Sequence, residues 1–171
     1  MLNVLIVTIM MLGSCAQEKM NKYVAESYEI SYPEKWVKQA KPNMVLFLSP
    51  QKNKTDFFQE NVNVMLQDLS SQPMTLEEYT DLTKQQVTQA LGASAIISLK
   101  DMNFAGQKAK EMIYNMPKNP MAGRNFNLKL RQIWFVKENK AYLFTYTAEK
   151  DEYENYLEVA KQTIDSFKLT H

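Results

Sequence analysis

The chain contains two apolar runs separated only by Glu138-Asn139: Asn127-Leu-Lys-Leu-Arg-Gln-Ile-Trp-Phe-Val-Lys137 and Lys140-Ala-Tyr-Leu-Phe-Thr-Tyr-Thr-Ala148. Asn tolerates the positive φ of a tight turn, so the two runs predict a β-hairpin. Side chains of a strand alternate between its two faces. Apolar residues occur in both alternating sets, namely Leu128, Leu130, Trp134 and Val136 in one set and Ile133 and Phe135 in the other. We therefore expect a central hairpin that is covered on both faces.

Two segments predict amphipathic helices. The first follows Pro73, begins with the capping-box pair Thr75 and Glu78, and ends before Gly92, a residue typical of helix ends. The second repeats apolar side chains at helical spacing, at Tyr153, Tyr156, Leu157, Ala160, Ile164 and Phe167.

Shorter apolar runs predict further strands at residues 28–32, 44–48, 62–69, 95–100 and 107–116. We interpret residues 51–61 and 117–126 as irregular loops. Most links between the predicted strands have hairpin length, and the order is strands, helix, strands, helix. This order predicts an α+β fold in which an antiparallel sheet carries helices on both faces, as an α/β/α sandwich.

The N-terminal segment has the features of a bacterial lipoprotein signal. Residues 1–14 are uncharged and almost wholly apolar, and Leu12-Gly13-Ser14-Cys15 matches the lipobox. The apolar stretch is too short to span a bilayer and has the length of a signal h-region. We therefore expect a signal peptide (1–14), a lipidated Cys15 with a tether (15–25) and one domain (26–171). The lipid would anchor the protein to a membrane of the bacterial cell envelope, with the domain outside the cytoplasm.

No Lys or Arg precedes the apolar run. Either translation starts further upstream, or the N-terminal amine supplies the positive charge of the signal. A buried N-terminal strand with an incidental cysteine is the less favoured interpretation.

Composition argues against several classes of function. The 171 residues suit one domain with a sizeable core, and 20 basic against 19 acidic residues predict no strong attraction to nucleic acid. Cys15 is the single cysteine and His171 the single histidine. These two residues cannot assemble a zinc site, and neither Ser-His-Asp nor Cys-His catalysis is expected. We therefore predict no enzymatic activity, no metal and no cofactor.

Two other residue patterns have a structural and a functional interpretation. The carboxylate pairs Glu77-Glu78 and Asp151-Glu152 lie where the two helices begin, and the helix dipole favours acids there over general acid/base roles. The 11 methionines could bind Cu(I) through their thioethers, but gap filling in the core is favoured.

Several segments together resemble PsbP-like domains. These are Tyr28-Glu-Ile-Ser-Tyr-Pro-Glu-Lys-Trp36, Thr75-Leu-Glu-Glu-Tyr79, Phe104-Ala-Gly-Gln107, Lys140-Ala-Tyr-Leu-Phe-Thr-Tyr146 and Ile164-Asp-Ser-Phe-Lys168, and the likeness covers residues 26–169. The resemblance implies an α/β/α sandwich, shared with a nuclear Ran-binding factor, and a non-enzymatic role. Chloroplast members of this family dock on photosystem II, whereas its bacterial lipoprotein members are mostly uncharacterised. No functional residue carries over, because the chain has no histidine where a metal site could be transferred.

The two predicted loops are the candidate binding segments, since loops on a rigid scaffold commonly carry function. Phe57 and Phe58 would form an apolar patch if exposed, and Lys118 and Arg124 could contact an acidic partner. Buried phenylalanines and solvated bases are the favoured structural interpretation of these residues. We expect a non-enzymatic envelope lipoprotein that binds an unidentified envelope protein. The second hypothesis is a carrier of a small apolar or lipid-like ligand between helix and sheet, with a cavity of several hundred cubic ångströms.

Overall fold

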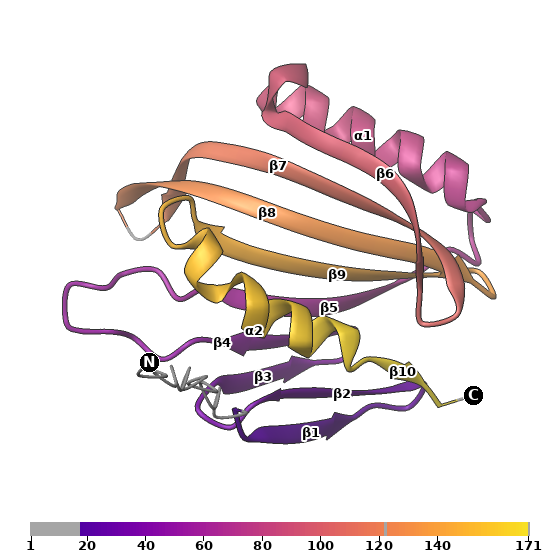
Figure 1. Cartoon of the computed structure of the whole chain (residues 1–171). Helices are drawn as coiled ribbons and strands as arrows, with labels where there is room; N and C mark the ends of the chain where they lie inside the picture. Colours follow the sequence, from indigo (N-terminus) through magenta and orange to yellow (C-terminus); the bar gives the residue numbers. More distant parts are fainter. Residues whose placement is uncertain (1–17, 122, 171) are drawn as a thin grey trace, which may run out of the picture.

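Two antiparallel sheets and two helices form the protein in a computed structural model, which describes residues 18–121 and 123–170 (Figure 1). The large sheet contains β3 (Val37–Lys41), β4 (Met44–Leu48), β5 (Asn61–Asp68), β6 (Ile96–Phe104), β7 (Gln107–Met121), β8 (Arg124–Lys137) and β9 (Lys140–Glu149). The small sheet contains β1 (Met20–Val24), β2 (Tyr28–Pro33) and β10 (Lys168–Leu169). The helices are α1 (Leu76–Leu91) and α2 (Tyr153–Asp165), and a short 3-10 helix, η1 (Ala93–Ala95), follows α1.

The predicted hairpin lies at the centre of the large sheet, whose order is β3-β4-β5-β9-β8-β7-β6. Its turn places Glu138 and Asn139 at φ 51° and 55°, and Trp134 lies opposite Leu143 in the register. Both faces of the hairpin are buried. Leu128, Leu130 and Trp134 pack with Tyr79 of α1, whereas Ile133 and Phe135 pack with Tyr153 and Ile164 of α2. The α+β fold with a helix on each face of the sheet is confirmed.

Helix α1 begins and ends as predicted. The Thr75 hydroxyl accepts the backbone N–H of Glu78 at 3.2 Å, and the Glu78 carboxylate accepts the N–H of Thr75 at 2.8 Å. Gly92 has a φ of 85° and donates its N–H to Thr88 at 2.9 Å. The Tyr79 hydroxyl donates to Gln67 of β5 at 2.9 Å, which holds the helix against the sheet.

The other face of the large sheet is shared between α2 and the small sheet (Figure 1). Tyr32 of β2 stacks on Phe47 of β4 with ring centroids 4.6 Å apart. The Tyr146 hydroxyl donates to the Tyr153 carbonyl at 2.7 Å, which holds the start of α2 on β9. No helix among the described residues is both long and apolar enough to cross a membrane.

The structure differs from the predicted tether. Residues 20–24 form β1, an edge strand paired with β2 from Met20–Pro33 to Val24–Glu29. Only Met20 and Tyr23 of this strand are partly buried, so its alternating pattern is too weak to recognise in the sequence.

The predicted loop at residues 117–126 is wrong as well. Strands β7 and β8 continue through it, and Met121 pairs with Arg124 next to the turn. Pro117 and Pro120 suggested a loop, but β7 extends here beyond the last pair with β6, Ile96–Tyr114. Proline is tolerated in such an edge position, and the bulge between Met116 and Asn119, with Lys118 at φ 54°, contains Pro117.

Candidate functional site

The two predicted binding loops meet at one end of the molecule, which we call the loop end (Figure 1). The register aligns one row of residues across the large sheet at this end: Val37, Leu48, Asn61, Thr147, Leu130, Tyr114 and Ile96. The loop of residues 49–60 and the tip of the β7–β8 hairpin both extend beyond this row. The guanidinium of Arg124 lies over the ring of Phe57, with its carbon 3.5 Å from the ring centroid. Residues far apart in the sequence therefore form one surface.

Phe57 and Phe58 do not form an exposed pair. Phe57 is 44% exposed, but Phe58 is only 3% exposed and packs on Phe126 with ring centroids 5.5 Å apart. Adjacent side chains of an extended segment point to opposite sides, so one ring faces solvent when the other enters the core. The expectation of an exposed patch is therefore wrong for Phe58.

The predicted bases lie on the hairpin tip beside an apolar residue that the sequence analysis missed. Lys118 and Arg124 are exposed, and the backbone N–H of Lys118 donates to Asn127 at 3.1 Å. Met121, which is 42% exposed, pairs with Arg124. We call Phe57, Lys118, Met121 and Arg124 the hairpin-tip surface. Cys15 and His171 lie outside the described residues.

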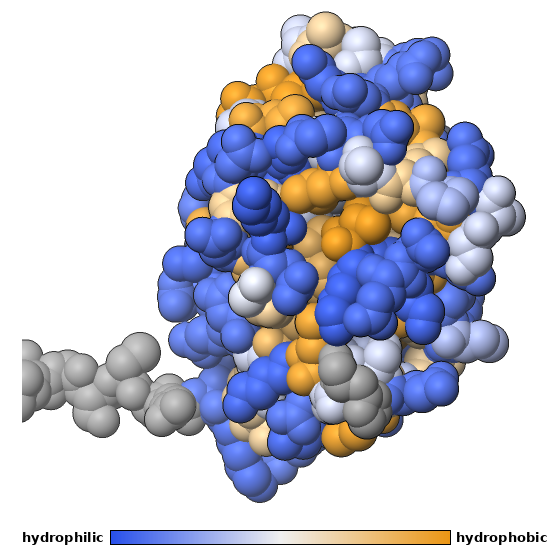
Figure 2. Space-filling view, turned by 90° about the vertical axis from the view of Figure 1, so that its right-hand side faces the viewer, coloured by the Kyte–Doolittle hydropathy of each residue, from blue (hydrophilic) through white to orange (hydrophobic). Residues whose placement is uncertain are grey.

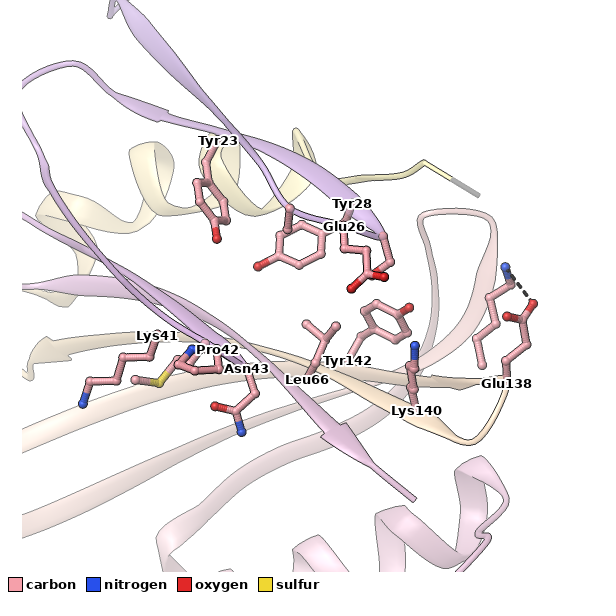
Figure 3. A pocket seen from close by; sticks show the side chains of 14 residues that line it. Tyr23, Glu26, Tyr28, Lys41, Pro42, Asn43, Leu66, Glu138, Lys140 and Tyr142 are labelled. Atoms are coloured by element: carbon pink, nitrogen blue, oxygen red, sulfur yellow. Dashed lines mark ion pairs between the residues drawn. The ribbon is translucent and has the colours of Figure 1, made fainter. Parts of the chain in front are cut away.

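At the opposite end, a pocket of about 290 Å³ lies between the small sheet and the large sheet (Figure 3). Tyr23 and Tyr28 project into it from the small sheet, and Leu66 and Tyr142 project from the large sheet. Lys41, Glu26, Glu138 and Lys140 also line this tyrosine pocket. Figure 2 faces this end of the molecule and shows hydrophobic surface between hydrophilic borders.

The two buried tyrosines of the pocket are hydrogen-bond donors. Tyr28 and Tyr142 are each 4% exposed, and neither hydroxyl hydrogen-bonds to another residue in the described ranges. Burial, with smaller contributions from Tyr23 and Tyr142, raises the pKa of Tyr28 well above its usual value. Its hydroxyl therefore stays protonated and can donate to a ligand oxygen.

Buried and paired carboxylates elsewhere serve structural contacts. Glu111 accepts from Arg131 Nε at 2.6 Å and from Lys100 Nζ at 2.9 Å. Burial alone would raise the pKa of Glu111, but Lys100 and Arg131 together hold it below its usual value. Glu78 caps α1, and Glu152 pairs with Lys52, so these carboxylates have structural partners. Within residues 18–121 and 123–170, no group of three or more His, Cys, Asp or Glu side chains could hold a metal ion.

Comparisons with known proteins agree with this architecture. The sequence model of the PsbP family matches residues 18–169, almost the whole of the described chain. The protein therefore belongs to the PsbP family, and the matched region begins just before β1. A comparison with curated protein sequences finds no match.

Solved structures share the fold at low sequence identity. Cyanobacterial PsbP (CyanoP) from Synechocystis sp. PCC 6803 has a TM-score of 0.59 and 20% identity, covering 92% of this chain and 98% of that one. PA94 from Pseudomonas aeruginosa, described as a protein of unknown function and putative regulator, has a TM-score of 0.57 and 15% identity, with coverages of 86% and 94%. The Ran-binding protein Mog1p of Saccharomyces cerevisiae has a TM-score of 0.54 and 6% identity, with coverages of 89% and 96%.

Proposed function

We propose that this protein is a non-enzymatic lipoprotein of the bacterial cell envelope whose PsbP domain binds a protein partner at the membrane. The observation that carries the proposal is the exposed contact between Phe57 and Arg124. Aromatic residues, Met and Arg are enriched in protein interfaces, and Arg and aromatic residues commonly dominate their binding energy. The hairpin-tip surface combines these residue types, with Met121 and Arg124 on the β7–β8 hairpin and Phe57 on the loop before β5.

The lipobox at Cys15 supports the membrane location, since a lipid on that residue would fix the domain at a bilayer. Glu111 is paired with Arg131 and Lys100, so this buried carboxylate serves the fold.

Crosslinking in intact cells tests the proposal. We expect the lipidated protein to capture a specific neighbour that the Cys15→Ser form, exported through an ordinary signal, fails to capture. Phe57→Ser combined with Arg124→Gln should abolish this capture, because it removes both the exposed ring and the guanidinium over it. Val24→Ser is the matched control, because Val24 is 61% exposed but lies at the end of β1 that is far from the loop end. Unchanged capture by the Phe57/Arg124 variant would contradict the proposed surface.

The tyrosine pocket supports a second candidate function, the binding of a small ligand. It lies between the two sheets, not between helix and sheet as the sequence suggested. Its volume of about 290 Å³ suits a ring-sized molecule, and its lining offers tyrosine hydroxyls and the lysines Lys41 and Lys140. A ring-shaped compound that accepts hydrogen bonds fits this chemistry, since the carboxylates Glu26 and Glu138 also line the pocket and offset the lysines. Mass spectrometry of small molecules released from the purified protein tests it, and Tyr28→Phe should reduce the amount released.

A further inference from the structure

We infer that the partner of the hairpin-tip surface is a membrane-embedded protein, which binds where its own chain emerges from the bilayer. This inference rests on the proposed function, because it takes Cys15 as the lipid attachment site. It adds the class of the partner and the side of the domain that meets it.

The first step is the reach of the anchor. The backbone carbonyl of Lys19 accepts the N–H of Glu34 at 2.8 Å, and Lys19 Nζ contacts the Glu34 carboxylate at 2.7 Å. The chain is therefore fixed to the domain from Lys19 onward. Four residue steps separate Cys15 from Lys19, and a fully extended chain spans at most roughly 14 Å over that length. Lys19, the residue just before β1, must therefore lie within this distance of the lipidated cysteine.

The second step is the direction in which the domain faces. Met20 at the start of β1 pairs with Pro33, which is followed by Val37 at the start of β3. The start of β1 therefore lies at the loop end, where the loop of residues 49–60 and the hairpin tip also lie (Figure 1). The tether thus brings the loop end to the bilayer and leaves the tyrosine pocket at the far end.

The third step is the chemistry of the loop end. Three of the five exposed large apolar side chains among the described residues lie at or beyond its row, namely Val37, Phe57 and Met121, and Ile97 lies one residue inside it. Val24, the fifth, lies at the opposite end. Val37 and Ile97 lie on opposite edge strands of the large sheet, so the apolar surface at this end is that of Phe57 and Met121 beside Arg124. We expect this surface to have an occupant, and here that occupant is next to a membrane.

A protein fits this surface better than lipid alone. Arg124 covers one face of the Phe57 ring, so the ring is presented as part of a cation–π pair. Lys118 and Arg124 give the hairpin tip positive charge, but Asp56 and Glu152 also lie at the loop end, and Glu152 pairs with Lys52. The mixed charge predicts little general attraction to an anionic bilayer. A partner with an apolar pocket beside a carboxylate would match Phe57, Met121 and Arg124 directly.

A spacer experiment with the full-length protein in intact cells tests the inference. An aromatic photo-crosslinking amino acid replaces Phe57, which keeps a ring beneath Arg124, and in a control protein it replaces Val24. One form carries about 20 proline-rich residues between Gln17 and Glu18, which would hold the loop end up to about 60 Å above the bilayer. Its matched control carries a Gly/Ser spacer of the same length, which leaves the domain free to return to the surface. Mass analysis of the acylated N-terminal peptide verifies lipidation of each form.

We expect crosslinks from position 57 to a protein with transmembrane segments, in the parent and in the Gly/Ser form. The stiff spacer should reduce them at least tenfold, and position 24 should give none to that protein. Crosslinks that persist with the stiff spacer, or that join only lipid or a protein without transmembrane segments, would overturn the inference while leaving lipidation established. A parent protein without lipid on Cys15 would instead overturn the proposed function itself and the inference with it.

Discussion

The indole N–H of Trp134 donates a hydrogen bond to the hydroxyl of Thr80 at 3.0 Å, which joins β8 to α1 inside the core. The Thr80 hydroxyl donates in turn to the Leu76 carbonyl at 2.7 Å. Trp134 and Thr80 are both buried, so this hydroxyl provides the indole with a partner that water cannot replace.

Thr80→Val should therefore destabilise the protein. Valine keeps the shape of the side chain but leaves the buried indole N–H without an acceptor, at a cost of about 1–3 kcal/mol in the free energy of unfolding. Urea denaturation measures the change. Thr80→Ser is the control, because it retains the hydroxyl, and its loss should be clearly smaller. Equal losses in the two variants would show that the methyl group matters and the hydrogen bond does not.

The contact between Trp134 and α1 illustrates what the sequence could predict. Trp134 and Tyr79 belong to long segments with clear periodicity, and such segments reveal their buried faces without knowledge of their partners. The capping box around Thr75 is local as well, so the start of α1 is readable from the sequence.

Features that depend on distant contacts could not be predicted. In β1 only Met20 and Tyr23 are partly buried, and β10 has two residues, so these two strands of the small sheet have no periodicity to recognise. The tyrosine pocket requires Tyr28 and Tyr142 to meet across two sheets, and the hairpin-tip surface requires Phe57 to meet Arg124. No residue spacing encodes these approaches, because they follow from how the layers pack.

The ion pair between Glu111 and Arg131 should be important for stability. Glu111→Ala would leave the largely buried Arg131 guanidinium without its charge partner, at a cost of about 3–5 kcal/mol. Replacing both residues, as Glu111→Leu with Arg131→Met, should recover much of this loss, since no isolated charge remains. Chemical denaturation of the single and double variants provides the comparison. A double variant no more stable than Glu111→Ala would contradict this explanation.

The same pair predicts a pH dependence. The folded pKa of Glu111 lies below its unfolded value, so its ion pairs contribute stability above the unfolded pKa and lose it as the pH falls through the folded pKa. Glu111→Gln should therefore show a weaker decline of unfolding free energy on acidification. Denaturant titrations from pH 7 downward measure this slope, and an unchanged slope would exclude Glu111 as its source.

Glu60 should have the opposite effect. It is 2% exposed, and burial raises the pKa of its carboxyl above the usual value, although Ser49 donates to it at 3.4 Å. Its contribution to stability is full below the unfolded pKa and is lost as the pH rises through the folded pKa. The difference in unfolding free energy between Glu60→Gln and the wild type should thus be more favourable to the variant at pH 7 than at pH 4, as measured by thermal or urea unfolding. Glu158→Gln, at an exposed carboxylate of α2, is the control and should not alter this difference.

Gly92 should be irreplaceable at the end of α1 for reasons of backbone geometry. Its φ of 85° and ψ of 154° lie in a region that is essentially restricted to glycine. A Cβ at this position would meet no atom within 4 Å, so Gly92→Ala tests the backbone alone. We expect a loss of about 1–3 kcal/mol in unfolding free energy. Gly92→Asn should lose as much, because this is not the left-handed helical region that Asn tolerates; full stability of either variant would contradict the assignment.

The two adjacent rings of the loop end should respond in opposite ways to the same substitution. Phe58 is buried against Phe126, so Phe58→Ser should lower the unfolding free energy by about 3–5 kcal/mol, the range found when a core aromatic ring is removed. Phe57 projects to solvent beneath Arg124, so Phe57→Ser should change stability by about 0.5 kcal/mol or less. Urea denaturation of both variants decides between core and surface roles. We expect only Phe57→Ser to leave the fold intact, so loss of partner capture in that variant would report on binding, whereas the same loss in Phe58→Ser would report on folding. A severe loss of stability in Phe57→Ser would show that Phe57 belongs to the core and not to the hairpin-tip surface.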